Sequence, residues 1–139
     1  MTCMLIIGAS DAGISAALRI KQLDAQAQVT LAAADAYPNF SICGLPFYLS
    51  GEVADWRTLA HRTIQEIESH GIHLLLDHRA EKIDAQAKIV QMTAPNGEVK
   101  AVPYDRLLIG RAPNRPGRPS RVWTLPASSS CVGWPTALP

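Results

Sequence analysis

The sequence contains few cysteines and no C-x-x-C pair. Its three cysteines, Cys3, Cys43 and Cys131, are widely separated in a chain of 139 residues. This spacing argues against a disulfide framework, a zinc ribbon and a thioredoxin-like dithiol. A redox-active cysteine in this chain would therefore act alone or with a thiol that a substrate brings.

Long hydrophobic runs and a large excess of one charge are also missing. No apolar stretch approaches the roughly 20 residues of a membrane span, and the first residues lack the basic region and cleavage site of a secretory signal. The formal net charge is +1, which gives no reason to expect a nucleic acid or a membrane as a partner. We therefore expect a cytoplasmic protein.

The composition changes sharply after Gly110. Residues 1–110 have the apolar content of one globular domain, whereas residues 111–139 contain six of the ten prolines, four arginines and no acidic residue. We expect an irregular tail there. It is either a natural proline-rich linker or the non-native product of a shifted reading frame, and sequencing the coding DNA would decide between the two.

The N-terminal residues follow a strand–helix–strand pattern. A branched apolar run at residues 4–7 is typical of a buried parallel strand. Apolar residues then recur at helical period over residues 14–23, and residues 29–31 have the pattern of a second strand. This order is the βαβ unit, so we predict an α/β fold with a parallel sheet and a crossover helix.

The turn inside this unit runs from Gly8 to Gly13 and has G-x-G-x-x-G spacing with Ser10 in the middle. Gly8 allows the tight turn, Ser10 is small enough for a pyrophosphate to approach the backbone, and Gly13 lets helix and strand pack closely. The helix N-terminus offers N–H groups and partial positive charge to phosphates. Because the turn lies between a predicted strand and a predicted helix, we favour dinucleotide binding over a merely structural turn. The predicted cofactor-binding residues are Gly8, Ala9, Ser10, Asp11 and Gly13.

The acidic residue that usually closes the second strand and binds a ribose is missing. Ala32, Ala33 and Ala34 occupy the strand end, and Asp35 follows one or two residues late. Asp35 is therefore a candidate for ribose binding, with a loop-capping role as the alternative.

The rest of the domain has recognisable local signals. Residues 35–52 form a long loop rich in aromatic residues, and loops of this length without regular structure are often functional. The remaining patterns predict a helix at 59–69, a strand at 72–76, a β-hairpin of runs 80–91 and 98–103 around Asn96-Gly97, and a buried parallel strand at 104–109.

The segment Asn39–Tyr48 carries the most specific signal. It reads N-F-S-I-C-G-L-P-F-Y, with Cys43 directly before Gly-Leu-Pro in the aromatic loop. This combination after a dinucleotide turn resembles the single-cysteine branch of the pyridine nucleotide–disulfide oxidoreductases, which includes coenzyme A disulfide reductases, NADH oxidases and NADH peroxidases. The resemblance covers residues 1–110, including the Tyr-Asp-x-Leu-Leu-Ile strand, and implies an incomplete Rossmann-like FAD/NAD(P)-binding domain.

The resemblance implies that the turn cradles the pyrophosphate of FAD and that Cys43 lies beside the flavin as the redox thiol. NAD(P)H would reduce the flavin, which would pass electrons to the sulfur. Cys43 would cycle through a mixed disulfide with a small thiol, such as coenzyme A from its disulfide, or through a sulfenic acid. Without these neighbours Cys43 would be interpreted as a small buried hydrophobic residue, as we expect for Cys3.

The chain also departs from the family. Oxidase and peroxidase members carry a histidine in the phosphate turn, where this chain has Asp11, which favours disulfide reduction over peroxidase chemistry. The family continues with a second glycine turn, an NAD(P) domain and a dimerisation domain, which this sequence lacks. We therefore expect a truncated fragment that is inactive alone. The alternatives are a nucleotide-binding module for FAD or NAD(P) without redox turnover, or a product with no stable fold.

A metal site is not expected. The three histidines His70, His73 and His78 cross a predicted helix end and a strand, so their side chains would not converge on one ion.

Overall fold

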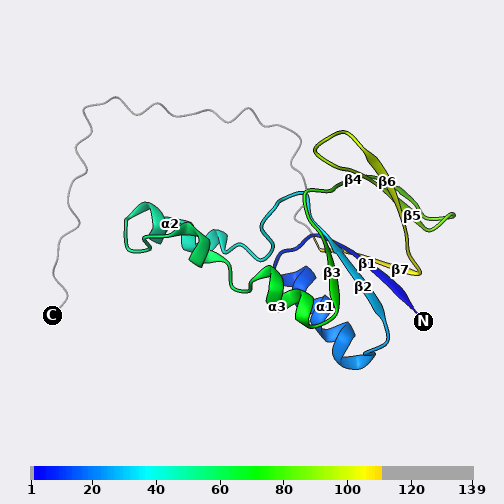
Figure 1. Cartoon of the computed structure of the whole chain (residues 1–139), viewed down its shortest axis with the longest axis horizontal. Coiled ribbons are helices and arrows are strands. Elements are labelled where there is room, and N and C mark those ends of the chain that lie inside the picture. The colour runs from blue at the N-terminus through cyan, green and yellow to red at the C-terminus, as the bar shows by residue number, and fades with distance from the viewer. Residues whose placement is uncertain (1, 111–139) are drawn as a thin grey trace.

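The computed structural model describes residues 2–110, and the predicted tail at 111–139 lies outside them (Figure 1). Its central element is a parallel four-stranded sheet in the order β3-β2-β1-β7. The strands are β1 (Cys3–Ile7), β2 (Gln28–Ala32), β3 (Ile72–Leu75) and β7 (Arg106–Ile109). The predicted α/β fold with a parallel sheet is therefore confirmed.

Helices cover one face of this sheet. Helix α1 (Asp11–Leu23) connects β1 to β2, and α3 (Ile64–Ser69) precedes β3 and lies beside α1 (Figure 1). Ile14 and Ala17 of α1 and Ile67 of α3 pack on alternate strand residues in a buried cluster completed by Ile6, Ala27, Val29, Leu31 and Ile72. The longest helix within residues 2–110 is α1, with 13 residues, and none of the described helices has the length and apolar character to cross a bilayer.

An antiparallel sheet covers the opposite face. Its strands, in the order β4-β5-β6, are β4 (Arg79–Asp84), β5 (Ile89–Thr93) and β6 (Val99–Pro103). Val90 and Met92 of β5 are fully buried against Leu5 and Ile7 of β1. Side chains of β1 thus alternate between the two layers, which is why the strand is apolar throughout.

The hairpin prediction was correct at one turn and incomplete at another. The turn at Asn96-Gly97 joins β5 to β6, with Gly97 at φ +82°. The run 80–91 is not one strand, because a turn divides it into β4 and β5. In that turn the Asp84 carboxylate accepts hydrogen bonds from the N–H groups of Gln86 and Ala87 at 3.0 and 2.9 Å.

Two predictions between β2 and β3 were wrong. The loop at 35–52 contains a short 3-10 helix, η1 (Ile42–Gly44), and one turn of α-helix, α2 (Leu45–Leu49), in which Pro46 occupies a first-turn position. The helix predicted over 59–69 is two elements, η2 (Trp56–Leu59) and α3. The break falls at Thr63, whose Oγ1 accepts a hydrogen bond from the Glu66 N–H at 3.1 Å and caps α3.

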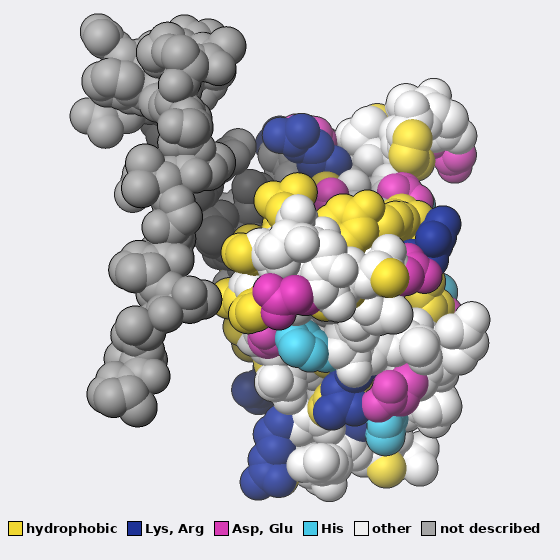
Figure 2. Space-filling view, turned by 90° about the vertical axis from the view of Figure 1, so that its left-hand side faces the viewer, with side chains coloured by type: hydrophobic (Ala, Val, Ile, Leu, Met, Phe, Trp, Pro, Cys, Tyr) yellow, Lys and Arg dark blue, Asp and Glu magenta, His cyan; other side chains and the backbone are white. Residues whose placement is uncertain are grey.

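The segment with α2 extends away from the two sheets as an arm (Figure 1). Figure 2 views the molecule from the side of this arm and shows hydrophobic side chains on its surface. The exposed apolar residues of the arm are Ile42, Phe47, Tyr48 and Leu49.

Candidate functional site

In the predicted glycine turn, at the carboxyl end of β1, backbone segments pack directly against one another. Gly8 has φ +111°, and its N–H donates to the carbonyl of Ala32 at 2.8 Å. An ideal Cβ on Gly13 would overlap the carbonyl oxygen of Gly8. Only a residue without a side chain fits at Gly13, so glycine here is required by packing rather than by φ.

Helix α1 begins within the turn. Ser10 is the N-cap residue, and its carbonyl accepts the first helical hydrogen bond from Ile14 at 3.0 Å. The predicted start of this helix at residue 14 was three residues late, because the turn residues Asp11 to Gly13 already belong to α1. The first N–H groups of a helix have no partner within it, which provides donors for an anion.

Gly110 is a member of this site that sequence reasoning missed. The Ser10 hydroxyl donates to the Gly110 carbonyl at 3.0 Å, and an ideal Cβ on Gly110 would lie 3.3 Å from Cα and N of Gly13. Its signal in the sequence was a glycine directly after a buried parallel strand. The carboxyl ends of neighbouring parallel strands meet at one sheet edge, so this glycine adjoins the turn.

Two cavities open beside the turn and share the residues Gly8, Ala9, Ala33 and Asp35. The first, about 550 Å³, is bounded on its far side by the loop at 35–52, called here the cysteine loop, and by η2, through Tyr37, Phe40, Ile42 and Trp56. The second, about 410 Å³, runs toward β4, and its other lining residues include Ile7, His78, Arg79, Ala80, Glu81, Ile83 and Ile109. Both volumes are in the range of small-molecule and cofactor sites.

Asp35 lies where the two cavities join, with its side chain exposed. Strand β2 ends at Ala32, and Ala33, at the place where a ribose-binding acid would stand, is buried. The loop keeps Asp35 near the strand end, because the N–H of Asp77 donates to its carbonyl at 3.3 Å. Asp35 therefore lines both cavities despite its late position in the sequence.

Cys43 lies in η1 and is exposed. It is not among the residues that line either cavity, but its neighbour Ile42 lines the larger one. Trp56, which the sequence did not single out, organises this wall: its ring meets Tyr37 edge-on at a centroid distance of 4.9 Å and Phe40 at 6.1 Å. The structure therefore places Cys43 on the loop that forms the aromatic wall of the cavity.

Cys3 differs from Cys43. Cys3, which we expected to be a small buried residue, is only half-buried on β1, and its Sγ lies 3.4 Å from Oε1 of Gln28. Cys131 is outside the described residues. Within residues 2–110, no group of three or more histidine, cysteine or acidic side chains is arranged to hold a metal ion.

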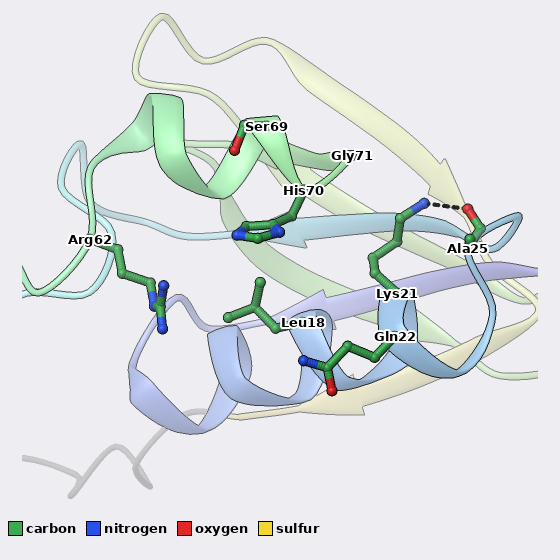
Figure 3. Close-up of a pocket in the computed structure, with 8 residues that line it drawn as sticks. All are labelled: Leu18, Lys21, Gln22, Ala25, Arg62, Ser69, His70 and Gly71. Atoms are coloured by element: carbon green, nitrogen blue, oxygen red, sulfur yellow. Dashed lines mark hydrogen bonds between the residues drawn. The ribbon is translucent and has the colours of Figure 1, made fainter.

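A third cavity, about 500 Å³, lies between α1 and α3, and none of the predicted site residues lines it (Figure 3). Lys21 Nζ is held there by the carbonyls of Ala25 and Ala27, each at 2.9 Å. Arg62 forms an ion pair with Glu66. Both cations therefore already have partners within the described residues.

Two known proteins are similar to this chain in sequence. The chain is 29% identical over 109 residues to the NADH oxidase of Enterococcus faecalis, a match that covers 76% of this chain and 24% of the oxidase. It is 30% identical over 115 residues to the CoA-dependent NAD(P)H sulfur oxidoreductase of Pyrococcus furiosus, covering 81% of this chain and 25% of that protein. The chain thus spans about a quarter of the length of these relatives.

The fold matches as well. The crystal structure of reduced Bacillus anthracis CoADR-RHD superposes with a TM-score of 0.76 at 22% identity, over 83% of this chain and 21% of the other. The family model for pyridine nucleotide-disulphide oxidoreductases matches residues 2–131. The chain therefore belongs to the pyridine nucleotide-disulphide oxidoreductase family, as a segment of the FAD-binding Rossmann-like domain of flavoprotein reductases.

Proposed function

We propose that this chain is the N-terminal part of an FAD-dependent NAD(P)H:disulfide oxidoreductase in which Cys43 is the redox thiol. The observation that carries the proposal is the joint position of the glycine turn and the cysteine loop on one cavity. The family binds FAD and NAD(P)H. The whole reaction needs residues beyond this segment, so the chain alone is expected to bind but not to turn over.

The residues of the turn fit a dinucleotide. A pyrophosphate at Gly8, Ala9 and Ser10 would face the N–H groups at the start of α1, where the helix dipole favours negative charge. The two cavities diverge from this point, as a molecule with a planar group at each end of a pyrophosphate requires. Asp35, at their junction, is the residue we propose for a ribose hydroxyl.

Bound FAD would supply the electrons, taken from NAD(P)H, that reduce sulfur. The step that residues of this chain would carry out is thiol–disulfide exchange at Cys43. Its thiolate attacks one sulfur of a small disulfide such as coenzyme A disulfide, forms a mixed disulfide with that half and releases the other half as a thiolate. The exposure of Cys43 allows this approach.

Flavin binding can be tested at Ser10 by a matched pair of variants. Aspartate is a preferred N-cap residue, so Ser10→Asp keeps the helix start and places a carboxylate against the pyrophosphate. Ser10→Asn has nearly the same shape without the charge. In a titration followed by flavin fluorescence, we expect Ser10→Asn to bind FAD more weakly than the parent chain, because its side chain is larger, and Ser10→Asp to bind FAD at least tenfold more weakly than Ser10→Asn. Equal affinities for the two variants would contradict phosphate binding at the turn.

The role of Cys43 is tested by its reaction with coenzyme A disulfide. Peptide mass spectrometry measures the rate of mixed-disulfide formation at Cys43 and, as an internal control, at Cys3. We expect bound FAD to change the rate at Cys43 and leave that at Cys3 unchanged, and Cys43→Ser to remove the adduct. FAD binding without any effect on Cys43 would favour the second candidate, a nucleotide-binding module without redox turnover, which the absence of Cys43 from the cavity lining also fits.

A further inference from the structure

Asn39 is the only buried polar residue within residues 2–110, with 4% of its surface exposed. It lies in the cysteine loop, four positions before Cys43, and adopts φ +59°. Asparagine is one of the few residues that tolerate this left-handed conformation. Burying an amide costs free energy unless it is hydrogen-bonded. The hydrogen-bond partners of Asn39 therefore indicate its structural role.

The side chain of Asn39 joins three segments. In the orientation that satisfies both of its neighbours, Nδ2 donates to the carboxylate of Asp11, and Oδ1 accepts from the backbone N–H of Arg62 at 3.1 Å. Asp11 is in the first turn of α1 and belongs to the glycine turn, whereas Arg62 leads into α3. One amide therefore ties the dinucleotide turn to the loop and to the following chain.

The backbone of Asn39 repeats the same connections. Its N–H donates to the carbonyl of Ala9 in the glycine turn at 2.8 Å, and its carbonyl accepts from the N–H of His61 at 3.2 Å. The adjoining loop continues this pairing, since the N–H of Ser41 donates to the carbonyl of Leu59 at 3.0 Å. The loop beyond Ser41 has mostly exposed residues and local backbone hydrogen bonds, so its backbone attachment to the domain is made by this short stretch.

We infer that Asn39 is a positioning residue that, through Asp11, fixes the Cys43 loop to the dinucleotide turn. The inference rests on the proposed function for its catalytic meaning. A group that contacts both elements makes the state of one depend on the state of the other, and such coupling is reciprocal. Asp11 then acts as the acceptor that holds the loop, which gives this unusual residue of the turn a defined task.

Hydrogen exchange of the apo chain tests the connection directly. We expect Asp11→Ala to speed exchange at the amides of Asn39 and Ser41 about tenfold, the effect of losing one hydrogen bond to a charged group. Asp11→Asn retains an acceptor oxygen and should stay within about threefold of the parent. The amide of Leu31, in the core, reports any global loss of stability and should not change.

The control variant is Asp24→Ala, at the other end of α1. Its carboxylate accepts a local hydrogen bond from the Gln26 N–H at 3.0 Å and does not reach the loop. We expect it to leave the Ser41 amide unchanged. Parent-like exchange at Ser41 in Asp11→Ala, or equal acceleration in Asp11→Asn, would overturn the inference, because the hydrogen bond would then not be what holds the loop.

A second variant relates the connection to Cys43. Asn39→Gly keeps the positive φ accessible and removes the amide. This variant should bind FAD within about threefold of the parent. Bound FAD should no longer change the rate at which Cys43 forms a mixed disulfide with coenzyme A disulfide. An FAD effect of parental size in this variant would refute coupling through Asn39. If the parent chain binds no FAD, the proposed function fails, whereas the hydrogen-exchange comparison still decides whether Asn39 fixes the loop.

Discussion

The glycine turn and the cysteine loop form opposite walls of one cavity, but they are stabilised in different ways. In the turn, backbone packs on backbone: Gly13 meets Gly8, and Gly110 meets Gly13. The loop is fixed by Asn39 at its base and by aromatic contacts of Trp56, while Cys43 and most residues of α2 are exposed. Close backbone packing is thus concentrated at the glycine turn, and the proposed reactive thiol lies on a segment with few buried contacts, which is expected to open at lower free energy.

The largest expected effect is in the core beneath the turn. Leu31 of β2 is fully buried between the sheet and α1. Leu31→Ala removes that packing and leaves a cavity, so we expect a loss of about 3 kcal/mol in the free energy of unfolding. Urea unfolding measures it. A loss below about 1 kcal/mol would show that this layer is not the stable part of the molecule.

The next effect is in the turn itself. Gly13→Ala would gain helix propensity, but its Cβ would overlap backbone that cannot move aside, so we expect a net loss of about 2–3 kcal/mol. The control is Gly51→Ala, where φ is +86° and nothing lies within 4 Å; strain alone should cost about 1 kcal/mol there. Equal losses in urea unfolding would refute the close approach at Gly13.

A smaller effect is expected from the same substitution in the cysteine loop. An ideal Cβ on Gly44 would lie 2.6 Å from Cδ2 of Leu59. Because the neighbour is the end of a flexible side chain, Gly44→Ala should cost about 1 kcal/mol. Thermal unfolding of Gly44→Ala and Gly13→Ala under the same conditions compares the two losses of stability. If Gly44→Ala lost as much stability as Gly13→Ala, the loop would be as tightly packed as the turn.

The smallest effect is expected at the tip of the arm. Leu49 is 81% exposed, so Leu49→Ala should change the free energy of unfolding by less than about 0.5 kcal/mol. The difference between the losses in unfolding free energy caused by Leu31→Ala and by Leu49→Ala measures how much more the buried core contributes to stability than the exposed arm. A cost above about 1 kcal/mol would show that the arm is packed against other parts of the chain.

The sequence was most informative where structure depends on neighbouring residues. The βαβ unit, the glycine turn and the Asn96-Gly97 hairpin follow from apolar period and turn chemistry, and all three are present. The predictions failed where a single polar side chain interrupts a pattern. Thr63 starts α3 later than periodicity indicated, and Asp84 divides one extended run into β4 and β5.

By itself, the sequence determined that a strand, a glycine turn and a helix would form, because glycine spacing and apolar periodicity act over a few residues. Only the tertiary structure decided how distant residues complete the site: Gly110 closing on Ser10, 100 positions away, Trp56 forming the aromatic wall and Asn39 reaching Asp11. These contacts depend on the parallel order of the strands, which brings their carboxyl ends to one edge of the sheet, and no local pattern records which side chains meet there.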